Sequence, residues 1–171
     1  MTLIYLRATQ MKDLQTVFTI IKQAQTLLKN EHIDQWQDGQ PSLAQLQQDI
    51  LHQQSYVLIS KQHICGTAVL LQQPEPNYLQ LQTAWHSQTV YATIHRFAIA
   101  QAHQGQHLGN RLLSHLITLG YQQGFCNFRI DTHPNNLRMQ HLIKEAGFIY
   151  RGSICLNKNP KKPRLAYELN L

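Results

Sequence analysis

The sequence is short of acidic residues. Nine Asp and Glu stand against fifteen Lys and Arg in 171 residues, so the formal net charge is +6. An excess of positive charge favours an anionic ligand or partner without naming one. Four of the basic residues, Lys158, Lys161, Lys162 and Arg164, form a cluster near two prolines. We expect this cluster to be the solvated tip of a hairpin rather than a nucleic-acid surface.

Long apolar runs are missing as well. No stretch approaches the ~18 apolar residues that a membrane-spanning helix needs, and the first residues lack a signal-peptide pattern. We therefore expect a cytoplasmic protein with no membrane partner. The three cysteines are an odd number at wide spacings with no C-x-x-C. This pattern argues against a structural zinc site and favours buried free thiols in a reducing compartment.

Several catalytic motifs are also absent. There is no G-x-S-x-G for a serine nucleophile, and Cys126 has no evident activating neighbour for a cysteine acyl-enzyme. His103 and His107 have an i, i+4 spacing, but Gly105 lies between them and no H-E-x-x-H is completed. We therefore expect no metal.

Hydrophobic periodicity predicts one domain over residues 1–171. Apolar residues at helical spacing predict helices at about 10–29, 42–52, 108–124 and 136–147. Alternating or β-branched runs predict strands at 3–6, 55–60, 64–71, 78–82, 93–99, 127–132, 148–156 and 165–169. This order predicts an α/β fold of the α+β type, with one mixed sheet and helices on its faces.

The most informative stretch is residues 92–123, which predicts a strand, a glycine-containing turn and a long amphipathic helix. Such a junction points free backbone N–H groups and the positive end of a helix dipole at one spot, which suits a phosphate. The turn matches neither G-x-x-x-x-G-K-[ST] nor G-x-G-x-x-G. It matches a third phosphate-binding pattern more nearly, Gln/Arg-x-x-Gly-x-Gly/Ala.

Residues 93–109, which end in HRFAIAQAHQGQHLG, resemble the acetyl-coenzyme A signature of the GCN5-related N-acetyltransferase (GNAT) superfamily. Asn136, followed later by Gly147-Phe148, resembles its second signature. The resemblance implies a GNAT-like mixed, mostly antiparallel sheet with a splayed strand pair and about four helices. It also implies an N-acetyltransferase that moves an acetyl group directly from acetyl-coenzyme A, its cosubstrate, to a primary amine.

The resemblance further implies a coenzyme site in two parts. Phe97, Ala98 and Ile99 would bond the pantetheine arm and the thioester carbonyl through their backbone, in the gap beside a bulged strand. The turn that would hold the pyrophosphate comprises Gln104, Gly105, Gln106, His107, Leu108, Gly109 and Asn110. Asn136 would bond the pantetheine, hold the splayed strand or cap the last helix. His107 stands where glycine is usual, and its N–H can serve a phosphate if its φ is negative.

The catalytic residues are less well defined. Many family members carry a tyrosine seven residues after the asparagine as general acid, and here that position is Ile143. An ammonium of pKa ~10.4 must lose a proton before it attacks, so a histidine base is useful. His95 on the central strand and His133 at the end of the next strand are the candidate bases. Tyr150 is the candidate acid.

The acceptor is not identified by the sequence. Asp34 and Trp36, between the first two helices, suit a cationic amine through charge and cation–π contact, and a surface loop anchored by a buried tryptophan is the alternative. A small metabolite, an antibiotic, or a peptide amine at a protein N-terminus or lysine all fit. A homodimer also stays open, since dimerisation is common among proteins of this kind.

Two other classes of function remain. The first is a sensor or scaffold that binds acyl-coenzyme A without turnover, which the isoleucine at position 143 keeps open. The second, ranked last, is a basic protein associated with nucleic acid through residues 158–164. These classes predict different experimental results. A sensor binds the coenzyme without releasing thiol, whereas a nucleic-acid-associated protein binds RNA or DNA in a salt-dependent way.

Overall fold

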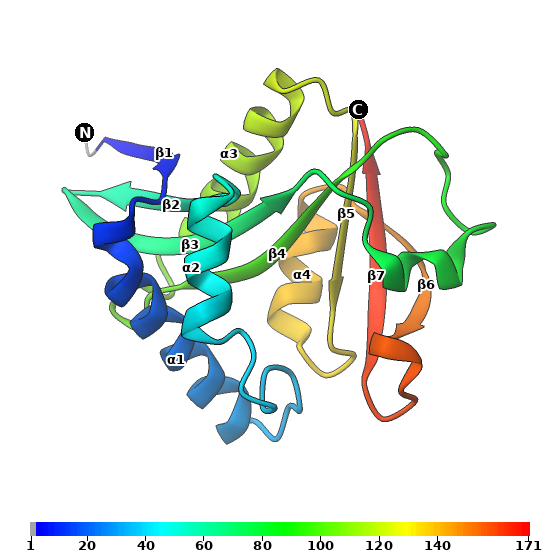
Figure 1. Cartoon of the computed structure of the whole chain (residues 1–171), viewed down its shortest axis with the longest axis horizontal. Helices are drawn as coiled ribbons and strands as arrows, with labels where there is room; N and C mark the ends of the chain where they lie inside the picture. Colours follow the sequence, from blue (N-terminus) through cyan, green and yellow to red (C-terminus); the bar gives the residue numbers. More distant parts are fainter. Residues whose placement is uncertain (1–2) are drawn as a thin grey trace.

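The computed structural model describes residues 3–171, and its strands form one seven-stranded sheet in the order β1-β2-β3-β4-β5-β7-β6 (Figure 1). The strands are β1 Ile4–Ala8, β2 Ser55–Ser60, β3 His63–Leu71, β4 Ala92–Ile99, β5 Asn127–Thr132, β6 Ile149–Cys155 and β7 Pro163–Asn170. Neighbouring strands are antiparallel except β4 and β5, which are parallel. The expected mixed, mostly antiparallel sheet is therefore confirmed.

The four predicted α-helices are present, with short 3-10 turns between elements. The helices are α1 Leu14–Asn30, α2 Leu43–Leu51, α3 Leu108–Gln122 and α4 Leu137–Glu145, and the 3-10 turns are η1 Met11–Asp13, η2 Pro76–Leu81, η3 Gln101–His103 and η4 Leu156–Lys158. Helix α1 begins later than predicted because its first turn is η1. No helix in the described part of the chain is both long and apolar enough to cross a membrane.

Helices cover both faces of the sheet (Figure 1). On one face α1 and α2 pack against Val57 and Ile59 of β2. On the other face α3 and α4 pack in a core cluster that contains the intervening Leu58. Successive residues of a strand point to opposite faces, so one strand contributes to both cores.

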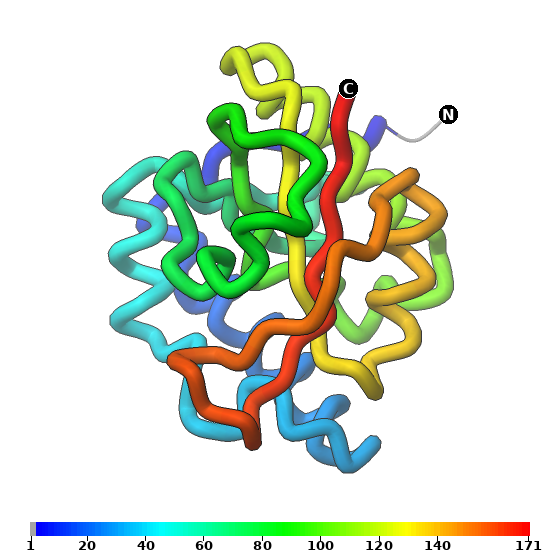
Figure 2. Tube along the Cα trace, turned by 90° about the vertical axis from the view of Figure 1, so that its right-hand side faces the viewer, coloured from blue at the N-terminus to red at the C-terminus, as the bar shows by residue number. Residues whose placement is uncertain are grey.

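The predicted strand at 78–82 is wrong, because residues 76–81 form the 3-10 turn η2. Pro76 has no N–H to give to a strand ladder and its fixed φ suits the start of a helical turn. The side chain of Glu75 caps the turn by accepting from the N–H of Asn77. Tyr78 and Trp85 then pack on β6 and β7, so this long connection lies over that part of the sheet (Figure 2).

All three cysteines are free. Cys65 is buried in β3 and Cys155 is half-buried, but Cys126 is exposed, contrary to the expectation of a buried thiol. Cys126 follows the tight turn at Gly124, where the chain passes from the end of α3 to β5. The apolar residues around it in sequence therefore do not enclose it.

Strands β4 and β5 pair over a short length only. Their register joins Ala92–Ile94 to Phe128–Ile130, and beyond Ile94 the two strands separate while β4 continues along β3. At the same place β4 bulges, since His95 pairs with Val69 and Ala98 with Thr67. Arg96 within the bulge has a φ of +52°. The expected splayed strand pair is thus present, and the far part of β4 presents an unpaired edge on its β5 side.

The packing of α3 on β5 gives a first prediction. Gly120 lies against the buried ring of Phe128, and a Cβ at this position would approach Phe128 Cζ to 2.8 Å. We predict that Gly120→Ala lowers the free energy of unfolding by about 1–3 kcal/mol, although alanine is the better helix former.

Gly109→Ala in the same helix is the matched control, because its added Cβ would meet nothing closer than Leu142 Cδ2 at 3.5 Å. Urea unfolding should show no loss of stability for this control. Equal stability of Gly120→Ala and the wild type would contradict the close approach of α3 to β5.

Candidate functional site

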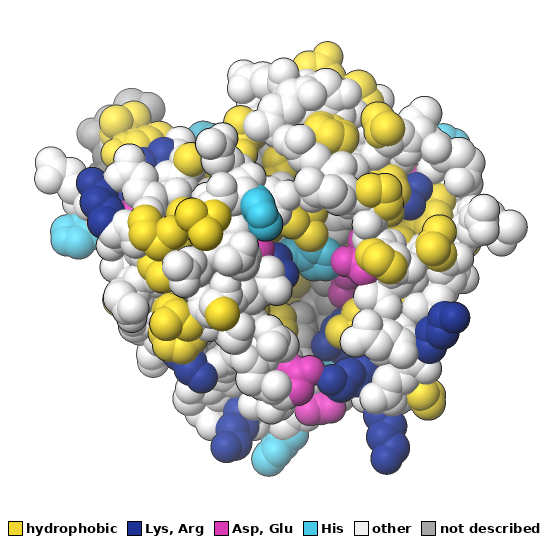
Figure 3. All heavy atoms as spheres, viewed as in Figure 1, with side chains coloured by type: hydrophobic (Ala, Val, Ile, Leu, Met, Phe, Trp, Pro, Cys, Tyr) yellow, Lys and Arg dark blue, Asp and Glu magenta, His cyan; other side chains and the backbone are white. Residues whose placement is uncertain are grey.

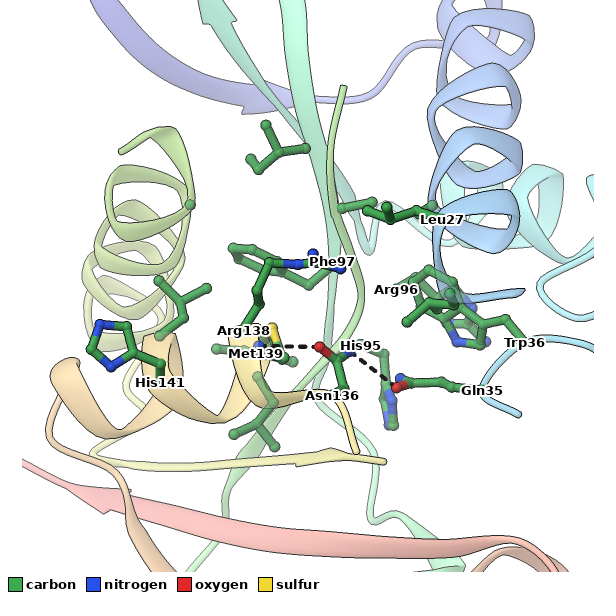
Figure 4. A pocket seen from close by; sticks show the side chains of 18 of the residues that line it. Leu27, Gln35, Trp36, His95, Arg96, Phe97, Asn136, Arg138, Met139 and His141 are labelled. Carbon is green, nitrogen blue, oxygen red and sulfur yellow. Dashed lines mark hydrogen bonds between the residues drawn. The ribbon is translucent and has the colours of Figure 1, made fainter. Parts of the chain in front are cut away.

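A cavity of about 640 Å³ opens where β4 and β5 separate. Its lining includes residues 94–99 of β4, the turn before α3, the start of α4 and the segment that joins α1 to α2. The predicted residues Phe97, Ala98 and Ile99 all line it, and Figure 4 shows Phe97 between α4 and α1. The volume is that of a small-molecule site.

The start of α3 leaves its backbone N–H groups free. Among residues 3–171 nothing accepts a hydrogen bond from the N–H of any residue between Gly105 and Asn110. By contrast, Ser42 caps α2 and Asn136 caps α4 through their side chains, whereas α3 has no side-chain cap. A helix start with free N–H groups and a positive dipole end is a site for an anion.

The turn itself combines two left-handed residues. Gly105 has a φ of +74° and His107 a φ of +55°, so the negative φ that we required of His107 is not found. The resemblance had placed glycine at the position of His107, and this conformation is the one that glycine adopts without strain. Histidine holds it at a cost of about 1 kcal/mol. The N–H of His107 nevertheless stays free, because α3 begins directly after it.

Most residues predicted in this turn line the cavity. Gln104, Gly105, His107, Leu108 and Gly109 line it, whereas the other two predicted residues do not. The side chain of Gln106 donates to the Ala102 carbonyl at 3.4 Å, and that of Asn110 donates to Glu145 at 3.1 Å. Any contact of these two residues with an anion would therefore come from their backbone.

Asn136 lies where β5 ends and α4 begins, and it has two roles. Its Oδ1 accepts from the N–H of Met139 at 3.2 Å, and its Nδ2 donates to Gln35 Oε1 at 3.2 Å (Figure 4). The same oxygen of Gln35 accepts from the N–H of His133 at 3.3 Å and from the hydroxyl of Thr132 at 3.4 Å. Gln35, which the sequence analysis did not single out, thus ties the α1–α2 segment to the end of β5.

His95 lines the cavity and contacts Glu75, a residue that the sequence analysis missed. The two atoms, His95 Nε2 and Glu75 Oε2, are 3.4 Å apart, and Nε2 is buried without a well-formed hydrogen bond. The contact with His95, together with donation from Asn77, lowers the pKa of Glu75 to about 2 against the opposing effect of burial. An ionised carboxylate beside Nε2 favours the neutral tautomer that carries its proton on that nitrogen.

The other candidate catalytic residues do not line the cavity. His133 is buried, its Nδ1 accepts from the N–H of Asn135 at 3.1 Å, and burial lowers its pKa. Tyr150 is half exposed on β6, where its hydroxyl lies 3.0 Å from Ser153 Oγ. Ile143 is wholly buried in the core. The expectation that His133 lies beside the gap is therefore corrected, and the roles of His133 as base and Tyr150 as acid stay predictions.

The segment between α1 and α2 reaches the cavity through one of its two predicted residues. Trp36 lines the cavity and is half-buried, whereas Asp34 is exposed and does not line it. Asp38 forms an ion pair of 2.6 Å with Lys162 of the β6–β7 loop. Within the described residues, no three His, Cys, Asp or Glu side chains are grouped so as to hold a metal ion.

Two arginines of the lining were not predicted. Arg96 lies 3.3 Å from Asp49 Oδ1, and burial lowers the pKa of this arginine and raises the pKa of this aspartate. Arg164 is 5% exposed, and its Nε lies 4.0 Å from Asp131 Oδ1. The expectation that Arg164 belongs to a solvated hairpin tip is wrong, because β7 begins at Pro163 and carries Arg164 into the protein.

Arg138 and Glu31 join the ends of α4 and α1. Both Nη atoms of Arg138 donate to the Glu31 carboxylate at 2.7 Å. The two side chains are 59% and 37% exposed, so water screens this pair. Arg138 also lines the cavity.

Comparison with known proteins gives a consistent result. The model of the Acetyltransferase (GNAT) family matches residues 21–148. A GNAT-family acetyltransferase of Streptococcus agalactiae has a TM-score of 0.86 at 26% identity, with 98% of this chain and 95% of that chain covered. A search of curated protein sequences finds no match.

Two further structures share the fold at lower identity. The Salmonella typhimurium protein yncA, determined with its cofactor acetyl-CoA, has a TM-score of 0.72 at 17% identity, with 99% of this chain and 94% of that chain covered. An aminoglycoside acetyltransferase in complex with coenzyme A and kanamycin has a TM-score of 0.68 at 22% identity, with 98% and 95% covered.

The contact between Glu75 and His95 predicts how stability depends on acid. The pKa of Glu75 falls from 4.5 to about 2 on folding, so its contribution is complete above pH 4.5 and is lost as the pH falls through 2. We predict that the wild type loses about 3 kcal/mol more than Glu75→Gln between pH 5 and pH 2.

Urea unfolding at a series of pH values measures this difference. Glutamine keeps an oxygen that can accept from Asn77, so the cap of η2 is retained in the variant. Parallel loss of stability in the two proteins would show that the carboxylate of Glu75 gains nothing from its surroundings.

Proposed function

The chain belongs to the GNAT family of acetyltransferases, and on that premise we propose that it transfers the acetyl group of acetyl-coenzyme A to a primary amine. The donor follows from the family, whose enzymes use acetyl-coenzyme A. One observation carries the proposal. The uncapped start of α3 and the unpaired edge of β4 lie in the same cavity as a histidine that contacts an ionised carboxylate.

The two parts of the site bind different parts of the donor. The free N–H groups from Gly105 to Asn110 suit the pyrophosphate. The edge of β4 at Phe97–Ile99 offers backbone groups to the pantetheine arm in the manner of an added strand. Asn136 stands opposite that edge at the start of α4, where its amide is held by Met139 and Gln35.

Bound in this way, acetyl-coenzyme A supplies an acetyl thioester, which an amine converts to an amide with release of a thiol. The chain contributes orientation and charge stabilisation. At the bulge of β4 no β5 residue pairs with the strand, so its backbone groups on that side have no sheet partner and are available to the donor. An N–H group fixed beside the reacting carbonyl stabilises the negative charge that develops on its oxygen.

We propose His95 as the general base. Glu75 keeps the proton of the neutral imidazole on Nε2, so Nδ1 can take a proton from the acceptor ammonium and leave the nitrogen lone pair free to attack. The carboxylate then stabilises the imidazolium. We do not assign the base to His133, because its Nδ1 already accepts the N–H of Asn135.

A dedicated acid is not part of the proposal. A leaving thiol has a pKa of ~8.5 and departs as thiolate near neutral pH. Ile143 is enclosed in the core, and Tyr150 lies on β6, with β7 between it and β5. Water in the open cavity can return the proton.

Binding of the donor is tested by thermal unfolding. Saturating acetyl-coenzyme A, at ~100 times its Kd, should raise the Tm of the wild type by about 5–10 °C. Gly109→Leu should fold, since the added Cβ meets only Leu142 and Phe97 at 3.5 Å or more. Both neighbours line the cavity, so the larger side chain fills the space beside the turn and abolishes the shift.

Thr118→Leu adds the same side chain to an exposed position of the same helix and should leave the shift intact. A wild-type Tm that does not respond to acetyl-coenzyme A would contradict the proposed function.

Proton removal is tested by thiol release with a panel of primary amines that includes amino acids, polyamines, amino sugars and peptides. His95→Gln should lower kcat about 10²–10⁴-fold near pH 7 and leave the Tm shift with acetyl-coenzyme A unchanged. The loss should shrink as the pH approaches ~10, where the amine loses its proton unaided.

His133→Asn is the control, because its side-chain oxygen can still accept the N–H of Asn135, and we expect its rate to match the wild type. A large loss in His133→Asn with none in His95→Gln would reverse the assignment. Binding of acetyl-coenzyme A with no thiol release from any amine would favour a sensor.

A further inference from the structure

The part of the cavity away from the α3 turn is a charged hollow. Glu75, Asp131 and Arg164 line it together with the apolar side chains of Trp36 and Leu156. Figure 3 shows side chains of both charges and histidine gathered in the hollow between the α1–α2 side and the β6–β7 side. Because β4 runs from His95 toward the turn at Gly105, this hollow and the proposed pyrophosphate site lie at opposite ends of the cavity.

Arg164 has unused donors in this hollow. Its guanidinium carries several N–H groups in a planar fork, and its side chain is 7% exposed. Among the described residues it donates one hydrogen bond, from Nη1 to the Pro163 carbonyl at 2.7 Å. The nearest carboxylate oxygen, Asp131 Oδ1, is 4.0 Å from Nε, which is beyond hydrogen-bond length. A buried guanidinium with open donors is a site for an anion with two oxygens.

Each of the three carboxylates near Arg164 either has another partner or is exposed to solvent. Asp131 accepts a hydrogen bond of 2.8 Å from the hydroxyl of Tyr78. Asp38 is paired with Lys162, and Asp34 is exposed. None of the three donates or receives a hydrogen bond with Arg164, so the fork of Arg164 is not saturated by this chain.

The opposite charge in the hollow belongs to the Glu75–His95 pair. Glu75 is ionised and lies beside His95, so an ammonium group is attracted to the place where the proposed base can deprotonate it. Arg96 acts on Asp49, which lies 3.3 Å from it, as well as on Glu75, so it offsets the charge of Glu75 only in part. The hollow therefore presents a negative site next to the base and a positive site at Arg164.

We propose that the acceptor is a zwitterionic amine, an amino acid or a similar small molecule whose carboxylate binds Arg164 while its amine meets His95 and Glu75. This inference rests on the proposed function and narrows its acceptor. Trp36 and Leu156 supply the apolar wall for the remainder of the molecule. A polyamine or an amino sugar lacks the carboxylate and would place positive charge against Arg164.

The test compares α- and ω-amino acids with their carboxamides, in which a neutral amide of similar shape replaces the carboxylate. In the ω-amino acids the amine is far from the carboxyl group, so its pKa changes little between acid and amide. Thiol release in the presence of acetyl-coenzyme A gives kcat/KM for each member of a pair. We expect the acid of an accepted pair to exceed its amide by about 10–100-fold, the size of a charge-assisted hydrogen bond. In Arg164→Gln, kcat/KM for the acid should fall to about the value for its amide, while the value for the amide stays the same.

Lys162→Gln is the matched control, because it removes one positive charge from the same segment at a residue that does not line the cavity. It should keep the preference for the acid. If Arg164→Gln no longer shows the Tm shift with acetyl-coenzyme A, its rates do not report on the acceptor alone. Arg164→Lys then tests the role of Arg164. Lysine keeps the positive charge but lacks the planar fork of N–H groups, so kcat/KM for the acid should fall at least about fivefold. The value for the amide should not change.

Each failure has a distinct pattern. Amides that react as fast as acids, or polyamines and kanamycin acetylated in preference to any amino acid, would overturn the zwitterionic acceptor and leave acetyl transfer to amines standing. An unchanged preference for acids in both Arg164 variants would overturn the role of Arg164. No thiol release from any amine would instead sink the proposed function itself.

Discussion

The site depends on the separation of β4 from β5 after Ile94. Backbone N–H and C=O groups in a sheet require partners, so two central strands seldom part without something to take their place. The bulge at Arg96 turns β4 away from its neighbour, and the free edge that results faces a cavity instead of another strand. Beyond η3, the start of α3 adds further free N–H groups. The cavity is thus lined by two separate sets of backbone groups, one on the edge of β4 and one at the start of α3.

Charged groups in the cavity are present in opposed pairs. Glu75 lies beside His95, Arg96 beside Asp49, and Arg164 near Asp131. Removing a charge from water costs several kcal/mol unless a partner offsets it, and none of these pairs has the geometry of a close, fully bonded ion pair. Incomplete pairing of this kind costs stability, and it is expected where a protein must bind or deprotonate a ligand.

Much of the coenzyme half could be predicted from sequence, because its elements are local. The strand, the turn and α3 follow one another along the chain, and Asn136 is recognised as a cap from its neighbours alone. The acceptor half is built from segments distant in sequence. Glu75 lies in a proline-containing connection with no periodicity, and Arg164 was grouped with the lysines next to it. Pattern alone does not say that β7 begins at Pro163 or that η2 replaces a strand.

The positions of two other predicted side chains, His133 and Tyr150, could not be predicted from the sequence pattern either. His133 follows β5 directly, yet its Nδ1 accepts the N–H of Asn135 and the residue does not line the cavity. Tyr150 lies in the edge strand β6, because β7 comes between β6 and β5 in the sheet. The order of strands, which depends on long-range pairing, decides the position of Tyr150.

The contacts that hold the two sides of the cavity together differ in kind, and this difference determines which solution conditions can loosen them. Gln35 joins the α1–α2 segment to the end of β5 through an uncharged amide. No proton or counter-ion competes for that oxygen, so the junction is insensitive to acidity and ionic strength. The exposed pair of Arg138 and Glu31 weakens as salt is added. High salt should therefore loosen the contact between Arg138 and Glu31, while the junction at Gln35 keeps its geometry.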